Sequence, residues 1–413
     1  MTQPAETPLR ILIAGPLPPE DGGTTTGGVA THVSELVHDL GSAGHVVSVY
    51  ADNMPAGAPI VREWGTIYPP LPTGESLRFS SLRDGGIAVI ARSVLAARSL
   101  KMRPTSTASH TMGMRRALLG ASPDVIHYHH AERRPEFGRL AGADAPTVTT
   151  VHSLSAFRDV GGSDTRELSL RNLRRADRVI AVSVDTATAL AEHAPDVGTT
   201  VIPNAIDVAA FSAGVESTPA APGTPLVLFL GWIATYKGVL DLVEAMTEVR
   251  TVVPTAALAI VGPEIDLTRE QVRAAWTGAP ESLALAEPVS KAGVIGWLQV
   301  ADVLAVPSRV RESGPRVALE AFAAGVPVVA CDVGSVRLTL GDGALGTLVT
   351  PGHPEELAAA IIDALAGGDA VHERVRAARE AVDAYDSSVI RARVLEVYRT
   401  AIERHATRPT QRG

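Results

Sequence analysis

Short apolar runs that alternate with stretches of helical periodicity constrain this chain most. Residues 9–16 (LRILIAGP), apart from Arg10, and 225–231 (PLVLFLG) are apolar without alternation, as in strands buried on both faces of a sheet. A loop rich in Gly, Pro and Thr follows the first run, and apolar residues then recur at helical spacing from Val29 to Leu40. A strand, loop, helix and next strand in this order form the crossover unit of a parallel sheet. The pattern therefore predicts an α/β fold.

The strand and helix pattern occurs in two series along the chain. After residue 208 a segment of small residues, Gly and Pro begins, which is typical of a linker between domains. We therefore predict two doubly wound, Rossmann-like domains over 1–208 and 222–385, followed by a helix and a disordered tail over 386–413. Because ligands of such folds bind at the carboxyl ends of the strands, we expect a site in a cleft across which the two domains face each other.

The composition excludes several classes of protein. The 413 residues include 37 Lys and Arg against 45 Asp and Glu, and only 4% are aromatic, so a nucleic-acid partner is not expected. The single cysteine, Cys331, allows neither an internal disulfide nor a zinc site built from cysteines. No run approaches the roughly 18 apolar residues of a membrane span, and the first residues lack the basic start of a signal peptide. We therefore expect a cytoplasmic protein.

The segment 81–120 differs from the rest in its charge. It contains seven basic residues and one acidic residue, and its part 85–103 (GGIAVIARSVLAARSLKMR) has the pattern of a basic amphipathic helix. Two interpretations stay open. The segment is either an ordinary solvated helix face, or a surface for peripheral contact with an anionic membrane or an anionic acceptor.

The strongest chemical signal lies in 307–330 (PSRVRESGPRVALEAFAAGVPVVA). Glu312 and Glu320 are eight residues apart, and Pro315 between them can occupy the first turn of a helix. The exposed N–H groups of such a helix start bind a diphosphate well, and the two carboxylates could then accept hydrogen bonds from sugar hydroxyls on either side. The N–H groups concerned are those of Gly314, Arg316 and Val317. On spacing alone, two ordinary glutamates at a helix start remain the alternative.

This segment resembles the Glu-x(7)-Glu motif of retaining GT-B glycosyltransferases of family 4. Further segments resemble that family in the same order along the chain, and the resemblance extends over about residues 10–365. They are GGVATHVSEL (27–36), PDVIHYHH (123–130), TTVHS (149–153), VIPNAID (201–207) and FLGWIATYKGV (229–239). The resemblance implies the GT-B fold, with an acceptor-binding N-terminal domain, a donor-binding C-terminal domain and a C-terminal helix that crosses back to the first domain.

The resemblance also implies a role for each matching residue. Glu312 would contact hydroxyls of the donor sugar, and His152 would be the active-site histidine; these two are the catalytic candidates. Lys237 would place a cation on the donor diphosphate, where it stabilises the charge that the leaving group gains. The other implied donor-binding residues are Glu320 at the ribose, Gly27 and Gly28 in a loop over the phosphates, and Gly314, Pro315, Arg316 and Val317. For His152, a capped histidine at a strand end remains the alternative.

One position departs from the family pattern. An arginine usually follows the first glycine of the phosphate-binding loop, but this chain has Trp232, which carries no charge. Either a nearby arginine (Arg309, Arg311 or Arg316) compensates, or phosphate binding is weaker. Further donor-binding candidates are Trp232 itself and, at strand ends where the family binds the base, Gly262 and Val289.

The histidines around Tyr128 raise the question of a metal. His127, His129 and His130 lie close together in sequence, but no carboxylate or cysteine has ligand spacing, so we expect no metal. We instead expect His129 and His130 to line the acceptor pocket. The chain has no Asp-x-Asp sequence, the pattern that metal-dependent GT-A enzymes use. This favours metal-free transfer, with a nucleotide-diphosphate-sugar as co-substrate and no cofactor.

We therefore predict a retaining hexosyltransferase-type enzyme that moves a sugar from a nucleotide-sugar to an acceptor hydroxyl. The acceptor would be a glycolipid or polysaccharide precursor, or a small secondary metabolite. Two alternatives stay open: a non-catalytic, nucleotide-sugar-binding partner of a glycosylation complex, which Trp232 would favour, and a sugar-nucleotide epimerase or hydrolase on the same fold.

Overall fold

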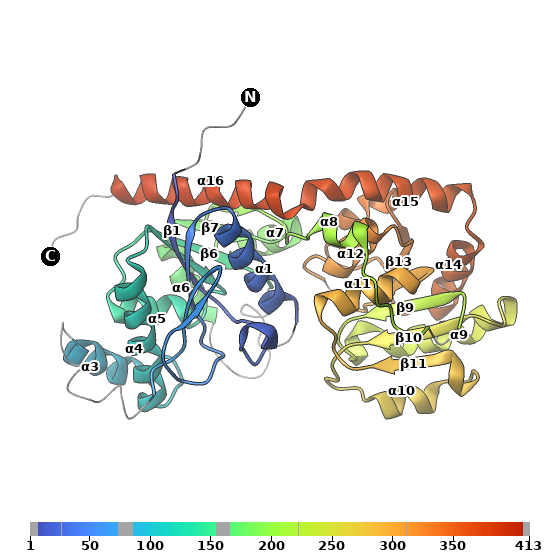
Figure 1. Ribbon diagram of the computed structural model, residues 1–413, viewed down its shortest axis with the longest axis horizontal. Helices are drawn as coiled ribbons and strands as arrows, with labels where there is room; N and C mark the ends of the chain where they lie inside the picture. Colours follow the sequence, from blue (N-terminus) through green and yellow to red (C-terminus); the bar gives the residue numbers. More distant parts are fainter. Residues whose placement is uncertain are drawn as a thin grey trace. The chain divides into compact units, whose positions relative to one another are not determined.

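The computed structural model describes residues 7–25, 27–72, 86–153, 166–221, 223–310 and 312–407. The chain divides into two compact units (Figure 1), of which the first contains residues 1–203 and 390–413 and the second contains residues 204–389. Both units are built on parallel sheets with helices between the strands, as the sequence pattern predicts. The predicted tail, 408–413, lies outside the described residues.

The sheet of the first unit has eight strands in the order β3-β4-β2-β1-β5-β6-β7-β8. Neighbouring strands are parallel except for β3 and β4, which form an antiparallel pair at the edge. From β4 to β8 this is a doubly wound order that reverses direction between β1 and β5. The strands are β1 (Arg10–Ala14), β2 (Val46–Tyr50), β3 (Ile60–Arg62), β4 (Gly65–Tyr68), β5 (Val125–His129), β6 (Thr147–Val151), β7 (Arg178–Ala181) and β8 (Thr199–Val201).

Period-two alternation in β5 assigns its side chains to two faces. Ile126 and Tyr128 pack in an apolar cluster with side chains of α4 and α5, among them Met114 and Phe137. His127 and His129 therefore face the opposite side. The helices of this unit are α1 (Gly28–Ser42), α3 (Gly86–Ala96), α4 (Pro104–Ala121), α5 (Arg134–Ala141), α6 (Arg166–Arg175) and α7 (Val184–His193), with a short 3-10 turn, η1 (Pro19–Asp21). Helix α16 (Ser387–Ala406) belongs to this unit from Ile390 onward.

The single amphipathic helix predicted over 85–103 is wrong in its extent. Helix α3 ends at Ala96, a turn follows, and α4 begins at Pro104. The residue before a proline avoids the helical conformation, and Arg103 is extended with φ −66° and ψ 140°. The described basic residues of 81–120 are therefore divided between two helices and the turn that joins them; 81–85 lie outside the described residues.

The sheet of the second unit has six parallel strands in the order β11-β10-β9-β12-β13-β14. This is the doubly wound order of a Rossmann fold, and it reverses direction between β9 and β12. The strands are β9 (Leu226–Leu230), β10 (Ala257–Val261), β11 (Leu283–Ala286), β12 (Val303–Val306), β13 (Val328–Cys331) and β14 (Thr347–Val349).

Alternate residues of β9 bury two separate cores on the two faces of this sheet. Leu228 packs with side chains of α11 and α12, whereas Val227 and Phe229 pack with side chains of α9 and α14. The helices are α8 (Val208–Ala213), α9 (Val239–Val252), α10 (Arg269–Ala275), α11 (Lys291–Val300), α12 (Arg316–Ala324), α13 (Val336–Thr339), α14 (Pro354–Ala366) and α15 (Asp369–Ala381). Short 3-10 turns are η3 (Thr235–Lys237), η4 (Pro280–Ser282), η5 (Gly341–Gly343) and η6 (Val382–Tyr385).

None of the helices in the described ranges is both long enough and apolar enough to cross a membrane.

Candidate active site

In the second unit, the candidate residues gather where the sheet reverses direction. The chain leaves β9 toward α9 on one face and leaves β12 toward α12 on the other, and the carboxyl ends of two such strands are where ligands of doubly wound sheets bind. Lys237 follows β9 and Glu312 follows β12, and the Lys237 ammonium donates to the Oε1 atom of Glu312. Ser308 donates to the same oxygen over 2.6 Å. The structure thus brings together two residues 75 positions apart in the chain.

A close backbone approach holds this ion pair. Gly238, directly after Lys237, has a φ of 68°, and a Cβ atom there would lie 1.9 Å from the carbonyl oxygen of Pro307. Only glycine therefore lets the loop after β9 lie against the loop after β12. On the other side, the Ser335 N–H donates to the Glu312 carbonyl over 2.8 Å. The carboxylate of Glu312 is fixed by its backbone as well as by its side-chain partners.

The segment before α12 has the form that anion binding requires. Pro315 is the N-cap of α12, one residue before the helical position predicted for it, and the N–H groups of the first helical turn have no partner within a helix. Gly314 has a φ of 143°, and a Cβ there would meet nothing within 4 Å, so the space before it is open. The positive end of the helix dipole and these N–H groups both favour an anion here.

Glu320 and Arg316 form a second ion pair one turn inside α12. Arg316 donates from Nε to the Oε1 atom of Glu320 over 2.8 Å, and its Nη1 donates to the Ala205 carbonyl over 3.0 Å. Both side chains are nearly buried. The pair therefore fixes the Glu320 carboxylate. The Arg316 guanidinium is held by Glu320 and by the Ala205 carbonyl, both in the second unit.

Trp232 stands where the family has an arginine, and the two described arginines that could compensate for it, Arg309 and Arg316, are both paired with carboxylates. Trp232 is 39% exposed. Arg309 donates to both carboxylate oxygens of Asp241, a residue that the sequence analysis did not identify. Arg316 donates to Glu320. Arg311 lies outside the described residues. In the part of the chain that the structure describes, the cation bound to Glu312 is Lys237.

The predicted base-binding positions lie at the ends of β10 and β11. Gly262 has a φ of 149°, and a Cβ there would lie 1.9 Å from the Gly231 carbonyl, so glycine is required where the two strand ends meet. Arg269, which sequence reasoning missed, donates to the carbonyls of Gly262 and Ala286 over 2.6 and 3.0 Å. Val289 is 37% exposed in the loop before α11.

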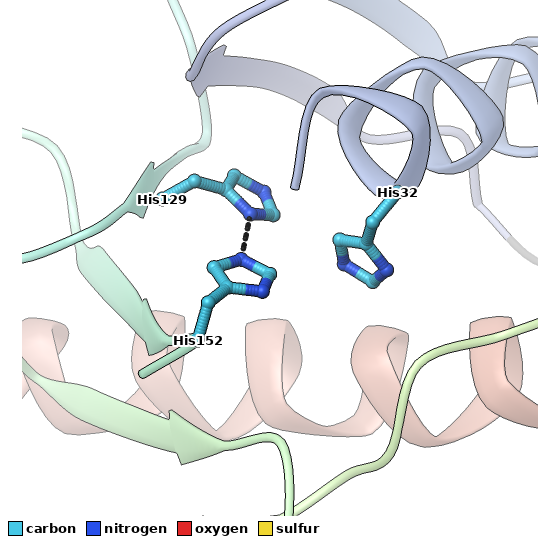
Figure 2. A group of neighbouring side chains, drawn as sticks. All are labelled: His32, His129 and His152. Atoms are coloured by element: carbon cyan, nitrogen blue, oxygen red, sulfur yellow. Dashed lines mark hydrogen bonds between the residues drawn. The ribbon is translucent and has the colours of Figure 1, made fainter. Parts of the chain in front are cut away.

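In the first unit, the carboxyl ends of the central strands carry histidines. His129 is the last residue of β5, His152 directly follows β6, and His32 comes from α1 (Figure 2). His129 Nδ1 and His152 Nε2 are 2.9 Å apart and hydrogen-bonded. The His32 ring centroid lies 5.4 Å from that of His129 and 5.1 Å from that of His152. All three side chains are buried.

His127, His129 and His152 have pKa values lowered far enough for these imidazoles to be neutral at physiological pH. Burial, and secondarily the charge of His32, lowers the pKa of His127 to about 3. Burial, followed by the neighbouring imidazoles, holds the pKa values of His129 and His152 well below the ordinary value. The His127 ring lies next to that of His129, with centroids 4.3 Å apart. It is held by hydrogen bonds of 2.8 Å to the Tyr398 hydroxyl on α16 and 2.7 Å to the Thr150 hydroxyl.

The loop after β5 is held by an ion pair that sequence reasoning did not identify. Arg134 donates from Nη2 to Asp52 over 2.6 Å and from Nη1 to the His129 carbonyl over 2.9 Å. His130, which lies between His129 and Arg134 in the sequence, adopts a φ of 74°. Its ring centroid lies 5.4 Å from that of His152. Of the two residues expected to line an acceptor pocket, His130 is half-buried and His129 is fully buried.

The predicted glycine loop lies at the start of α1. Gly27 is the N-cap of this helix with a φ of 112°, a conformation that favours glycine, and Gly28 is the first helical residue. A Cβ at Gly28 would meet nothing within 4 Å, so open space lies before it. His32 lies four residues after Gly28 and thus on the same helix face. This spacing is the signal by which the sequence could have placed His32 near the site.

The comparisons with known proteins agree with this architecture. The family model "Glycosyltransferase Family 4" matches residues 26–210, and "Glycosyl transferases group 1" matches residues 215–381. The phosphatidyl-myo-inositol mannosyltransferase of Mycobacterium tuberculosis is 31% identical over 390 residues, which cover 91% of this chain and 93% of that protein. The D-inositol 3-phosphate glycosyltransferase of Xylanimonas cellulosilytica is 29% identical over 334 residues, 74% of this chain and 79% of that protein.

Solved structures show the same fold. Sucrose-phosphate synthase from Thermosynechococcus elongatus superposes with a TM-score of 0.73 at 21% identity, covering 95% of this chain and 99% of that one. Anabaena HepE in complex with UDP superposes with a TM-score of 0.67 at 18% identity, covering 94% and 99%. The relatives are transferases, which does not favour a non-catalytic subunit or an epimerase. The chain belongs to family 4 of the glycosyltransferases, has the GT-B fold, and transfers a sugar from a nucleotide-sugar donor to an acceptor hydroxyl.

Proposed function

We propose that this glycosyltransferase is a retaining, metal-independent hexosyltransferase that binds the donor diphosphate between Lys237 and the start of α12. The observation that carries the proposal is the Lys237–Glu312 ion pair, which lies at the reversal point of the second sheet. Retention and a hexose donor are supported by membership of family 4. UDP in the HepE structure supports a nucleoside diphosphate as the common part of the donor.

Donor binding replaces the partner of Lys237. As the glycosidic bond breaks, negative charge grows on the leaving diphosphate, and the Lys237 ammonium and the N–H groups of Arg316 and Val317 stabilise it. Glu312 then accepts hydrogen bonds from hydroxyls of the donor sugar, and it remains positioned by Ser308 and by its backbone. Because Ser308 and the backbone already position Glu312, its carboxylate needs little reorganisation when Lys237 turns to the diphosphate.

Glu320 and His152 complete the proposed machinery. Glu320, held by Arg316, accepts hydrogen bonds from the ribose hydroxyls of the nucleotide. His152 contacts the sugar being transferred, and as a neutral imidazole it offers one donor and one acceptor without adding charge. A neutral group suits this task because the sugar ring itself gains positive charge as the glycosidic bond breaks, and a second cation beside it would oppose that change.

For the acceptor, we propose an inositol phosphate or a lipid that carries one. Two relatives, a phosphatidyl-myo-inositol mannosyltransferase and a D-inositol 3-phosphate glycosyltransferase, support this class. Helix α3 supports the lipid form, because Ile87, Val94 and Leu95 are 63%, 47% and 82% exposed beside Arg92 and Arg98. Apolar and basic side chains together favour peripheral contact with an anionic bilayer.

A nucleotide panel tests the donor site first. Thermal unfolding would be followed with UDP, GDP, ADP, CDP and dTDP for the wild type, Lys237→Ala and Glu320→Ala. A ligand at 100 times its Kd stabilises the folded protein by about 2.7 kcal/mol, so one nucleotide should raise the midpoint of the wild type and not of the variants. Lys291→Ala is the matched control, because Lys291 is also an ion-paired lysine of the second unit, bonded to Asp207. Stabilisation that survives both active-site substitutions would refute the placement.

Chelation and membrane binding test the remaining points. Transfer in the presence of EDTA should match transfer without it.

The wild type should co-sediment with vesicles containing phosphatidylinositol at low salt. Leu95→Glu should reduce the bound fraction, whereas Val61→Glu, at an equally exposed valine on β3, should not. Equal binding by both variants would remove α3 as the contact surface.

A further inference from the structure

The cluster of His32, His129 and His152 has a property that the transferase reaction does not use. The three residues come from α1, β5 and the end of β6, and each offers one ring nitrogen such that the three nitrogens lie within 4.8 Å of one another (Figure 2). All three side chains are at most 8% exposed. Three buried imidazoles that converge in this way offer a set of nitrogen ligands to one metal ion.

The donor set fits a divalent transition ion of the zinc class. Imidazole nitrogen is a preferred ligand of Zn²⁺, and sites with three histidines and one open position are known among zinc proteins. Zn–N bonds of about 2.0–2.1 Å at tetrahedral angles place two ligand nitrogens about 3.3 Å apart. The hydrogen-bonded nitrogens of His129 and His152 are 2.9 Å apart, so a few tenths of an ångström separate them from that spacing.

The surroundings fix two of these ligands before any ion arrives. The His129 carbonyl accepts a hydrogen bond from Arg134, and His127, on the same face of β5, is anchored to Tyr398 and Thr150. His152 follows directly from β6, which is paired on both sides within the sheet. Supporting groups of this kind orient ligands and raise metal affinity.

We propose that His32, His129 and His152 form a binding site for Zn²⁺ or a similar ion, with the fourth position open to water or to a substrate hydroxyl. The ion is not needed for transfer. It occupies the His152 nitrogen that the reaction uses, so bound metal inhibits transfer reversibly; this consequence, unlike the site itself, rests on the proposed role of His152.

Metal binding to the full chain without substrates tests the site directly. Calorimetric titration with Zn²⁺ should give one tight site per chain, and Co²⁺ should give the visible absorption of a tetrahedral complex. Loss of one ligand, in His32→Gln or His129→Gln, should weaken binding about 100-fold or more, since even loss of a supporting group costs about 10–100-fold. His38→Gln is the matched control: His38 is on the same helix as His32 and near a carboxylate, but it is exposed. It should bind as the wild type does.

The outcomes separate the site from the proposed function. No tight Zn²⁺ site in the wild type, or a site that His38→Gln removes and the cluster variants keep, would overturn the proposal. Circular dichroism of each variant establishes whether it is folded. If one of the two ligand variants fails to fold, the other still tests the site. If Zn²⁺ binds but transfer is unaffected, the site stands and the role of His152 fails. If Zn²⁺ inhibits transfer, EDTA should restore it, and His38→Gln should remain equally sensitive.

Discussion

In the second unit the segments after the two strands at the reversal point carry a lysine and a glutamate that form an ion pair, whereas in the first unit the ends of β5 and β6 carry neutral, buried imidazoles. The two units share the same doubly wound design. Their difference follows the chemistry of the proposed reaction, because a leaving diphosphate needs fixed charge, while a sugar needs hydrogen bonds of defined direction. The shared topology provides the position, and the side chains decide which substrate part it suits.

The largest effect is expected from removing the charge of the second unit. Lys237→Ala should lower kcat by about 10²–10³-fold, the usual cost of one electrostatic contact to a developing charge. Steady-state kinetics with the nucleotide-sugar found in the panel would measure it. Lys291→Ala should retain wild-type kcat. A comparable loss in both variants would mean that net charge of the unit, rather than the contact at β9, supports transfer.

The next effect concerns pH and the first unit. In the unfolded chain His127, His129 and His152 take up protons near pH 6.5, but in the folded chain their pKa values are far lower, His127 at about 3. Their contribution to stability is therefore complete above about pH 7 and is lost as the pH falls below 6.5. At pH 5.5 each should cost about 1.4 kcal/mol, or about 4 kcal/mol in all.

Hydrogen exchange, followed peptide by peptide, can compare the units over this pH range. In the second unit, a backbone hydrogen bond from Arg269 lowers the pKa of Glu264, so this group favours folding above its ordinary pKa and loses that effect only at more acidic pH. Between pH 7.5 and 5.5, protection after correction for intrinsic exchange should fall in β5 and β6 and persist in β9 and β12. A parallel fall in both units would contradict a histidine origin.

A smaller effect is expected from the glycine that holds the ion pair. Gly238→Ala combines a positive φ with a clash against Pro307, and it should destabilise the second unit by about 2 kcal/mol and weaken nucleotide binding. Gly352→Ala is the matched control, because Gly352 has a similar φ of 75° but a Cβ there would meet nothing within 4 Å. Its cost should be about 1 kcal/mol with nucleotide affinity unchanged. Equal losses would assign the effect to backbone strain alone.

The sequence predicted those parts of the molecule in which one local pattern decides the outcome. Continuous apolar runs predicted β1 and β9, and the segment 307–330 predicted that Glu312 precedes α12 and Glu320 lies within it. The short edge strands β3 and β4 were not predicted, because Ile60–Arg62 and Gly65–Tyr68 are partly exposed and have no long apolar run.

Contacts between distant segments could not be predicted in the same way. The approach of Gly238 to Pro307 depends on how two loops meet in three dimensions, and so does the grouping of His129 with His32 and His152. The sequence placed His129 instead beside its neighbours His127 and His130. A histidine at the end of a parallel strand is adjacent to residues of the next strand and of the covering helix, and these are distant along the chain.

The smallest effect should come from the buried support of the histidine cluster. Tyr398→Phe removes the hydroxyl that bonds His127 Nδ1 over 2.8 Å, and a buried ring nitrogen left without a partner costs about 1 kcal/mol or somewhat more. Chemical denaturation would measure the loss, with Thr150→Val, which removes the second partner of His127, as the companion variant. Because both hydroxyls bond one imidazole, the costs should not add in the double variant. Simple additivity would mean that His127 does not couple α16 to β6, and that the neutral cluster is held by packing rather than by directed hydrogen bonds.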